Sequence, residues 1–254
     1  MADIVFLGTG GGRFVTISQT RATGGIYIEE KGVAVHIDPG PGALVHMCGQ
    51  GIDPRQLDGV FVSHCHPDHY NDAEILVEAM THGGTRKRGV LAGSVSVLMG
   101  VGEFSPAVSP YHQKKPGRVE VMNPGDSVEI GHLRVVATPA VHSDPTAIGF
   151  VIETRGGRIS YSGDTVLREE VVKAHRGSDL LILNVTRPLG MEIPHHMSTG
   201  DALEFVKTVE PEMAVLTHFG GKFTEHLAEK EALFVERHSG VNTIAARDFM
   251  RISL

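Results

Sequence analysis

Six consecutive residues bring together four side chains that are able to bind a metal ion. Residues 64–69 read His-Cys-His-Pro-Asp-His, and they follow an apolar run at 59–63 that is typical of a short buried strand. Side chains alternate in extended backbone, so His64 and His66 are expected on one side and Cys65 on the other. We interpret Cys65 as a small buried residue that takes no part in ligation.

The second half of this motif is predicted to begin a helix. Pro67 favours an extended residue before it, and its fixed φ suits a first helical turn that Asp68 and His69 continue. Two imidazoles from a strand end and a carboxylate with a third imidazole from a helix can converge on one small volume. Such nitrogen and oxygen ligands suit a borderline divalent ion such as zinc. Burying these groups without partners would be costly, so a metal site explains them better than chance packing does.

The composition of the chain limits the classes of protein to which it can belong. Its 254 residues are 41% hydrophobic, enough for one large domain or two small ones. A net charge of −7 argues against broad binding to nucleic acid or to an anionic membrane. No apolar run approaches the roughly 20 residues of a membrane helix, and the N-terminus does not read as a signal peptide. Cys48 and Cys65 make no disulfide framework, so a cytoplasmic location is expected.

Short apolar runs separated by glycine predict a chain with many strands and fewer helices. The glycine-rich loop at 8–12 is followed by no obvious helix start, and residues 82–116 are interpreted as an irregular excursion. Residues 119–122, 127–130 and 133–137 are expected to form one meander of strands. Helices are expected at 43–47, 67–79, 166–174, 199–206 and 222–238, and the other strands at 3–7, 25–29, 33–37, 59–63, 149–153, 157–161, 180–184, 214–217, 243–246 and 249–252. This order favours a two-layer β core flanked by helices over a parallel Rossmann sheet.

Three further metal-ligand candidates each lie just after a predicted strand. They are His142, Asp164 and His218. Each alone is a weak signal. Together with the motif at 64–69 they make five histidines and two aspartates at strand ends, which is enough to hold two divalent ions.

With these residues the sequence resembles the metallo-β-lactamase-fold hydrolases over almost its whole length. The resemblance runs from the opening Phe-Leu-Gly-Thr-Gly at 6–10 through the motif at 64–69 to Leu-Thr-His-Phe at 216–219. It implies an α+β fold in which two mixed β-sheets flanked by helices form a four-layer αββα sandwich, in a single domain over 1–254. It also implies a complete dinuclear site, in which one ion takes His64, His66 and His142, the other takes Asp68, His69 and His218, and Asp164 bridges both.

Within this fold the sequence is most similar to the branch that contains RNase Z and cyclic phosphodiesterases. The similarity rests on the opening run with Ile-Asp-Pro-Gly at 37–40, and on His-Met-Ser-Thr at 196–199. In that branch a histidine at this place is thought to assist departure of the leaving group, which implies His196 here, with His195 as the alternative. The long arm that RNase Z enzymes use to grip tRNA is not evident. The two cysteines are too few for the added cysteine-rich metal site of some smaller relatives.

The resemblance implies a metal-dependent hydrolase, and we expect a phosphodiesterase that acts on a phosphodiester or a cyclic phosphate. Two divalent ions, Zn²⁺ first with Mn²⁺ or Fe²⁺ as alternatives, would share a bridging hydroxide, and Asp68 would orient the attacking water or accept its proton. His196 would donate a proton to the leaving oxygen. The expected partner is a small-molecule or short nucleotide phosphoester, and a homo-oligomer is left open.

The same ligands would also serve other chemistry, because a fold does not fix a function. The alternatives are a hydrolase of a lactone or thioester, a tRNA 3′-processing endonuclease of RNase Z type, a flavodiiron-type redox enzyme and a non-enzymatic metal-binding protein. His66 stands where the flavodiiron type has a carboxylate, which argues against that type. The basic runs at 85–88 and 113–116 are interpreted as solvated loop charges, with a local binding patch as the alternative.

Overall fold

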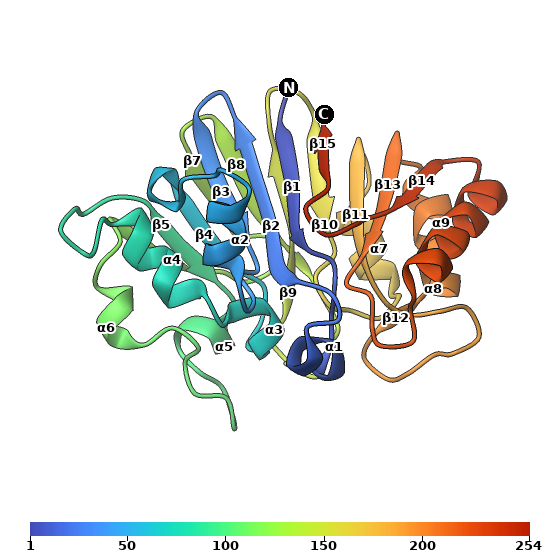
Figure 1. The fold of residues 1–254 in the computed structure, drawn as a ribbon, viewed down its shortest axis with the longest axis horizontal. Coiled ribbons are helices and arrows are strands. Elements are labelled where there is room, and N and C mark those ends of the chain that lie inside the picture. Colours follow the sequence, from blue (N-terminus) through green and yellow to red (C-terminus); the bar gives the residue numbers. More distant parts are fainter.

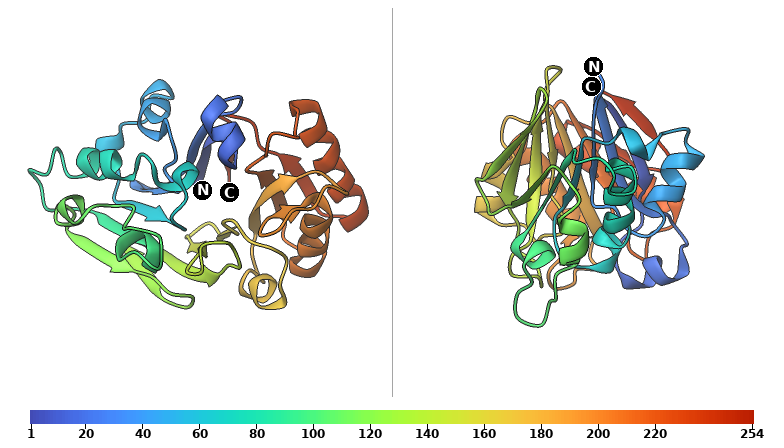
Figure 2. Two further views of the ribbon diagram at one scale, coloured as in Figure 1. Left: turned by 90° about the horizontal axis from the view of Figure 1, so that it is seen from below. Right: turned by 90° about the vertical axis from the view of Figure 1, so that its left-hand side faces the viewer.

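Two β-sheets pack face to face, and helices cover the outer face of each sheet (Figures 1 and 2). The computed structural model describes all of residues 1–254. The largest apolar cluster, 25 buried residues, lies between the sheets and includes Phe6 and Phe61 from one sheet and Phe150 and Ile182 from the other. This arrangement confirms the expected α+β, four-layer αββα sandwich.

The first sheet combines an antiparallel half with a parallel half. Its first three pairings, from β15 to β3, are antiparallel, and the last three, from β3 to β6, are parallel. The strand order is β15 (Arg251–Ser253), β1 (Asp3–Gly8), β2 (Thr23–Glu30), β3 (Val33–Ile37), β4 (Gly59–Val62), β5 (Val90–Gly93) and β6 (Arg118–Val121).

The second sheet repeats this pattern. From β7 to β10 the pairings are antiparallel, and from β10 to β14 they are parallel. The order is β7 (Ser127–Ile130), β8 (Leu133–Pro139), β9 (Ile148–Glu153), β10 (Arg158–Tyr161), β11 (Leu180–Arg187), β13 (Met213–Thr217) and β14 (Asn242–Ala245), and the short β12 (Met197–Ser198) pairs with β11. The two halves of the chain therefore have similar structures although the sequence shows no repeat.

Each sheet has its own outer layer of helices, because each outer face carries apolar side chains that need a cover. The first sheet packs on α2 (Ala43–Gly49) and α4 (Ala73–Met80). The second packs on α7 (Glu169–Ala174), α8 (Thr199–Val209) and α9 (Glu225–Ser239). Ser198 and Asp201 begin α8 with a reciprocal capping box. The remaining helices are short: α1 (Arg13–Ser18), η1 (Pro54–Gln56), α3 (Pro67–Tyr70), α5 (Val95–Leu98) and α6 (Pro110–Gln113).

Three local predictions were wrong. Residues 13–18 form α1, which the sequence did not predict. No helix start is visible there because the N-cap residue is Gly12, which has a φ of 76° and no side chain to cap the helix. The segment 82–116 holds the interior strand β5 and two short helices, since four apolar residues are too short a run to show a period. Residues 119–122 do not join the meander at 127–137, because β6 pairs with β5 in the other sheet.

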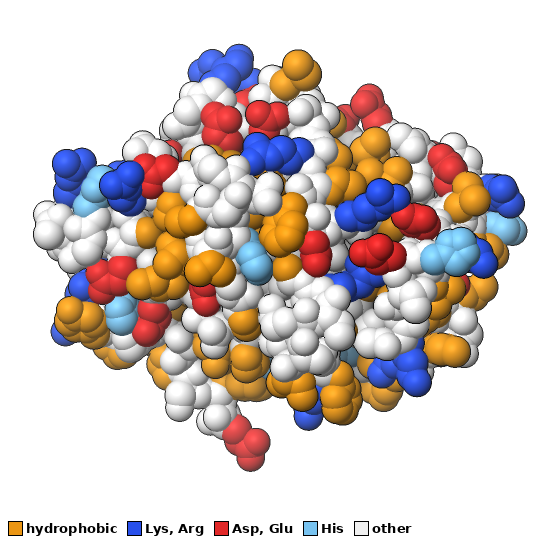
Figure 3. Space-filling view, in the orientation of Figure 1, with side chains coloured by type: hydrophobic (Ala, Val, Ile, Leu, Met, Phe, Trp, Pro, Cys, Tyr) orange, Lys and Arg blue, Asp and Glu red, His pale blue; other side chains and the backbone are white.

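The two basic runs meet one another and bind groups of the protein itself. Lys87 Nζ donates to the carbonyl oxygen of Lys114 at 2.6 Å, and Arg88 pairs with Asp58 at 2.7 Å. Lys115 pairs with Glu78 at 3.0 Å. On the side of the molecule drawn in Figure 3, cationic and anionic side chains are interspersed. No helix has both the length and the apolar character that crossing a membrane requires.

Burial of one histidine predicts a loss of stability in acid. The ring of His175 is fully buried against Phe205, and burial lowers the pKa of His175 to about 3. In the unfolded chain His175 has an ordinary pKa near 6.5 and binds a proton below that pH, whereas in the folded chain its ring stays neutral. The free energy of unfolding therefore falls as the pH drops below about 6.5. Between pH 7 and pH 5 this costs about 2 kcal/mol. His175→Gln should reduce the pH-dependent loss by that amount.

Urea unfolding of both proteins at pH 7 and pH 5 measures this difference. The control is His226→Gln, which changes an exposed residue of α9 and should leave the loss as it is in the unmodified protein. An equal loss in the unmodified protein and in His175→Gln would contradict the assignment.

Candidate metal centre

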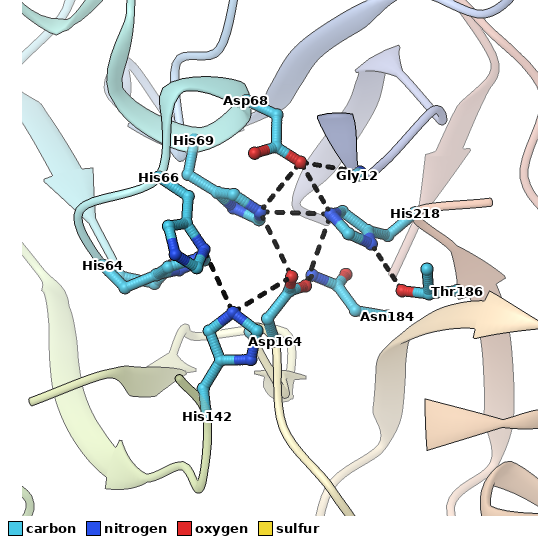
Figure 4. Close-up of polar contacts among 12 residues, drawn as sticks. Gly12, His64, His66, Asp68, His69, His142, Asp164, Asn184, Thr186 and His218 are labelled. Atoms are coloured by element: carbon cyan, nitrogen blue, oxygen red, sulfur yellow. Dashed lines mark hydrogen bonds and ion pairs between the residues drawn. The ribbon is translucent and has the colours of Figure 1, made fainter. Parts of the chain in front are cut away.

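The seven predicted metal ligands meet at one end of the sandwich (Figure 4). They lie on four connections that follow β4, β8, β10 and β13, so both sheets contribute. β4 ends at Val62, and α3 begins at Pro67, which brings the four ligands of the first motif into a single turn of chain. The ligand set is His64, His66, Asp68, His69, His142, Asp164 and His218.

Three imidazoles form the first group. His64 Nε2 lies 2.9 Å from His66 Nδ1, and His142 Nε2 lies 3.1 Å from the same atom. The three nitrogens face one small space, although His142 comes from the other sheet. This is the group that the resemblance assigns to one ion.

Two imidazoles and a carboxylate form the second group. His69 Nε2 lies 3.1 Å from His218 Nε2, which is 3.3 Å from Asp68 Oδ2. Asp164 stands between the groups, because its Oδ2 lies 3.6 Å from His69 Nε2 and 3.8 Å from His142 Nε2. The structure thus brings together the residues that the sequence proposed, and their binding of metal remains a prediction.

The hydrogen bonds around the cluster show that its donor atoms fit a cation. His142 Nδ1 donates to the carbonyl oxygen of His195 at 2.7 Å, and His69 Nδ1 donates to Asp38 Oδ2 at 2.8 Å. In each neutral ring the proton is therefore on Nδ1, and the lone pair of Nε2 points into the cluster. In the first group, His64 Nε2, His66 Nδ1 and His142 Nε2 face one another, and a divalent ion could bind all three nitrogens.

The charges in the cluster favour a cation as well. Burial alone would raise the pKa of Asp164, but His218 and His69 outweigh it and lower that pKa well below its usual value. Burial lowers the pKa of His64 well below its usual value, so the ring is neutral. Burial would also lower the pKa of His69, but Asp68, Asp164 and Asp38 outweigh it and raise that pKa. Asp164 and His64 are thus in the forms that bind metal, an ionised carboxylate and a neutral imidazole. The raised pKa of His69 means that its ring is charged when no cation is present, and a bound metal ion would replace the proton on Nε2.

Sequence analysis missed Asp38 as a supporting residue. Asp38 follows β3, and its buried carboxylate accepts from Ser63 N, Ser63 Oγ and Tyr161 Oη, each at 2.7 Å, as well as from His69. In the sequence it stands out only as part of the Ile-Asp-Pro-Gly run at 37–40. Asp38 directly follows a buried strand, as His142, Asp164 and His218 nearly do, and this shared position was the signal that could have identified it.

Asn184 and Thr186, on β11, also support the cluster and were not anticipated. Asn184 Nδ2 donates to Asp164 Oδ1 at 2.8 Å. Thr186 Oγ1 lies 3.1 Å from His218 Nδ1 and 3.2 Å from His196 Nδ1. Both residues lie inside a strand that is apolar along most of its length, and that setting gave no signal of a role at the site.

The structure distinguishes the two histidines at 195 and 196. His196 Nδ1 lies 3.4 Å from Asp164 Oδ2, and its side chain is 20% exposed. His195 contributes its main-chain carbonyl to His142, at a backbone φ of 66°. The side chain of His196 therefore contacts the cluster directly.

An open cavity of about 420 Å³ exposes the cluster to solvent, with Asp68, Asp164 and His196 in its wall. The glycine-rich loop at 8–12 borders the cluster: Gly12 N donates to Asp68 Oδ2 at 2.8 Å. A Cβ at Gly11 would lie 2.2 Å from the ring of His218, so only glycine fits there. A substrate could reach the cluster from this side.

Loss of the Asp38 carboxylate is expected to weaken metal binding. Asp38→Asn keeps the side-chain shape and tolerates the backbone φ of 52°, but it removes the charge that holds the Nδ1 proton of His69. The affinity for Zn²⁺ should fall by about 10- to 100-fold, the usual effect of removing such a support. Competition with a chromophoric chelator measures the affinity. Asp53→Asn, which changes a partly exposed carboxylate outside the cluster, is the control. An unchanged affinity in folded Asp38→Asn would contradict the assignment.

Comparison with known proteins places the chain in a family. Residues 34–219 match the family described as beta-lactamase superfamily domain. A protein of Methanocaldococcus jannaschii, described as uncharacterized, is 41% identical over 254 residues, which cover 99% of this chain and 95% of that protein. A ribonuclease Z of Methanosarcina mazei is 25% identical over 309 aligned positions, covering 100% of this chain and 98% of that protein.

Solved structures show the same fold. The metallo-beta-lactamase fold protein YhfI from Bacillus subtilis has a TM-score of 0.80 at 18% identity, covering 99% of this chain and 98% of that one. A diphosphatase from the PhnP family has a TM-score of 0.70 at 16% identity, covering 100% and 98%. With the family match over residues 34–219, the chain belongs to the beta-lactamase superfamily and is a hydrolase of the metallo-β-lactamase fold.

Proposed function

We propose that the protein is a dinuclear metal-dependent phosphodiesterase. The observation that carries the proposal is a pair of adjacent ligand groups with Asp164 between them, beside an open cavity whose wall includes a further histidine, His196. The similarity to a ribonuclease Z and to a diphosphatase supports a phosphoester as substrate. We take residues 1–254 as one domain, because the site needs ligands from both sheets.

His64, His66 and His142 would hold one divalent ion, Asp68, His69 and His218 the other, and Asp164 would bind both. Nitrogen and oxygen donors without thiolate favour Zn²⁺, with Mn²⁺ or Fe²⁺ as alternatives. When bound, such ions lower the pKa of a water molecule towards neutrality and offset the charge that develops on a phosphoryl oxygen. The free thiols of Cys48 and Cys65 agree with a reducing compartment, and we assign the protein to the cytoplasm.

Two side chains at the cavity would handle protons. Asp68 is held by the Gly12 amide through Oδ2, and it lines the cavity where it can orient a water molecule or accept its proton. His196 Nδ1 faces Asp164 and Thr186, so its Nε2 is the atom left to carry a proton to the leaving oxygen. Asp68 would thus act on the attacking water molecule, and His196 would act on the leaving oxygen.

A second candidate is a tRNA 3′-processing endonuclease of RNase Z type. The ribonuclease Z of Methanosarcina mazei, similar over the full chain, favours it. The alignment spans 309 positions whereas this chain has 254 residues, so that relative carries segments that this chain lacks. Three of the five cationic side chains in the two basic runs, those of Lys87, Arg88 and Lys115, are engaged with groups of the protein itself, which leaves less charge for binding a long RNA.

Two substitutions should separate metal binding from proton transfer. Asp164→Ala removes the carboxylate between the ligand groups, so bound metal and hydrolysis of an aryl phosphodiester should both be lost. His196→Ala should keep the metal and lower turnover by about 10²–10⁴-fold, the usual contribution of a positioned acid. Elemental analysis and initial rates, with and without a chelator, measure both effects. The control is His226→Gln. Full activity in metal-loaded His196→Ala would end the proposed role of that residue.

A panel of substrates tests the reaction class. We expect turnover of an aryl phosphodiester and of cyclic nucleotides, little turnover of a lactone or a thioester, and no specific cleavage of a tRNA precursor at its 3′ end. Loss of turnover after metal removal, and its return with Zn²⁺ or Mn²⁺, would tie each activity to the site. Preferential hydrolysis of the lactone, the thioester or the tRNA precursor would replace the proposed substrate class.

A further inference from the structure

A second cavity of about 370 Å³ adjoins the one that opens on the ligand cluster. The two cavities share four lining residues, Gly12, Arg13, Ser143 and His196, so they form one continuous cleft. The second cavity extends away from the ligands, between the start of α1 and the segment 193–196. A substrate that reaches the cluster has room for a further group on this side.

The charge of the second cavity differs from that of the protein as a whole. No aspartate or glutamate lines it, whereas Arg13 and Arg187 both do. The molecule carries a net charge of −7, and the first cavity contains Asp68 and Asp164. This part of the cleft is therefore a local positive region that would attract an anion.

The two guanidinium groups have no partner within the protein. Neither Arg13 nor Arg187 makes a side-chain hydrogen bond or an ion pair, and the Nε atom of Arg187 is buried without an acceptor. A buried donor without an acceptor is costly, and a guanidinium offers two parallel donors to a phosphate.

The position of His196 shows which part of a substrate would occupy this region. His196 lines both cavities, and in the proposed reaction it gives a proton to the leaving oxygen. The leaving oxygen must therefore lie at the junction of the cavities, and the rest of the leaving group must extend into the second one. We propose that Arg13 and Arg187 form a subsite for a second phosphate, carried by the leaving-group fragment of the substrate; this assignment rests on the proposed phosphodiesterase function.

The second phosphate can come from two sources with the same chemistry. It is either a terminal phosphate on a small phosphodiester or the next backbone phosphate of a nucleotide strand. Both present anionic oxygens that a guanidinium binds in the same way. The subsite selects for that group and not for a base.

A set of thymidine substrates tests the subsite with the metal-loaded protein. TpT carries only the scissile phosphodiester, TpTp and pTpT carry a terminal phosphate at one end or the other, and TpTpT carries a second backbone phosphate. We expect kcat/KM to be at least about tenfold higher for one of the two singly phosphorylated dinucleotides than for TpT, as one charge-assisted hydrogen bond would give. In Arg187→Met and in Arg13→Met this ratio should fall towards one.

The control is Arg237→Met, which removes the same charge from an exposed position of α9 outside both cavities, and it should keep the ratio. A preference for a terminal phosphate but not for TpTpT identifies a small substrate, and equal preference identifies a strand. Equal rates on all four substrates in the unmodified protein would overturn the inference. An equal loss on all four in Arg187→Met would overturn it as well.

Binding measurements keep the test separate from catalysis. The ratio of dissociation constants for thymidine 5′-monophosphate and thymidine 3′,5′-bisphosphate reports the second phosphate alone, since both ligands offer one phosphate to the metals. That ratio should fall by about tenfold in Arg187→Met and stay constant in Arg237→Met. If TpT, the aryl phosphodiester and the cyclic nucleotides are all left uncleaved, the proposed function fails, and the binding ratio still decides whether the subsite exists. An unchanged ratio in Arg187→Met would overturn the subsite.

Discussion

One buried carboxylate, Asp38, joins the two sheets at the candidate metal centre. It lies at the end of β3 in the first sheet, and it accepts a hydrogen bond from Tyr161, which ends β10 in the second. It also accepts from Ser63 and from His69. A buried carboxylate is tolerated only when donors replace its water, and here four donors do so. These four hydrogen bonds offset the free-energy cost of burying the charge, and the one from His69 also fixes the position of that ring.

The similarity of the two halves explains why the ligands converge. Each sheet passes from antiparallel to parallel pairing, and the ligand-bearing connections follow strands in both. The first sheet supplies residues 64–69, and the second supplies His142, Asp164 and His218. Neither half has a complete ligand set, so the site exists only when the inner faces pack together. Metal binding at this site would therefore be coupled to the packing of the 25-residue core between the sheets.

The sequence was most informative where a strong local pattern met a polar residue. The run at 59–63 followed by two histidines predicted both the strand β4 and the direction of the ligands, and His142, Asp164 and His218 lie as expected after β8, β10 and β13. It was least informative where a residue acts through packing. Asn184 and Thr186 lie inside an apolar strand, and their roles depend on which strand lies beside β11. β5 was missed because four apolar residues carry too little periodic information.

Three residues at this end of the molecule, Asp38, His195 and His218, have a left-handed backbone, with φ of 52°, 66° and 59°. Residues with a Cβ hold this conformation at a cost of about 1–3 kcal/mol when it is strained, so surrounding bonds must maintain it. An ion bound to the cluster would add such a bond at His218, and its removal would leave fewer bonds to hold that conformation. Without metal, local unfolding would then begin at the end of the sandwich that holds the ligand cluster. Metal depletion in the cell would therefore make the protein easier to degrade as well as inactive.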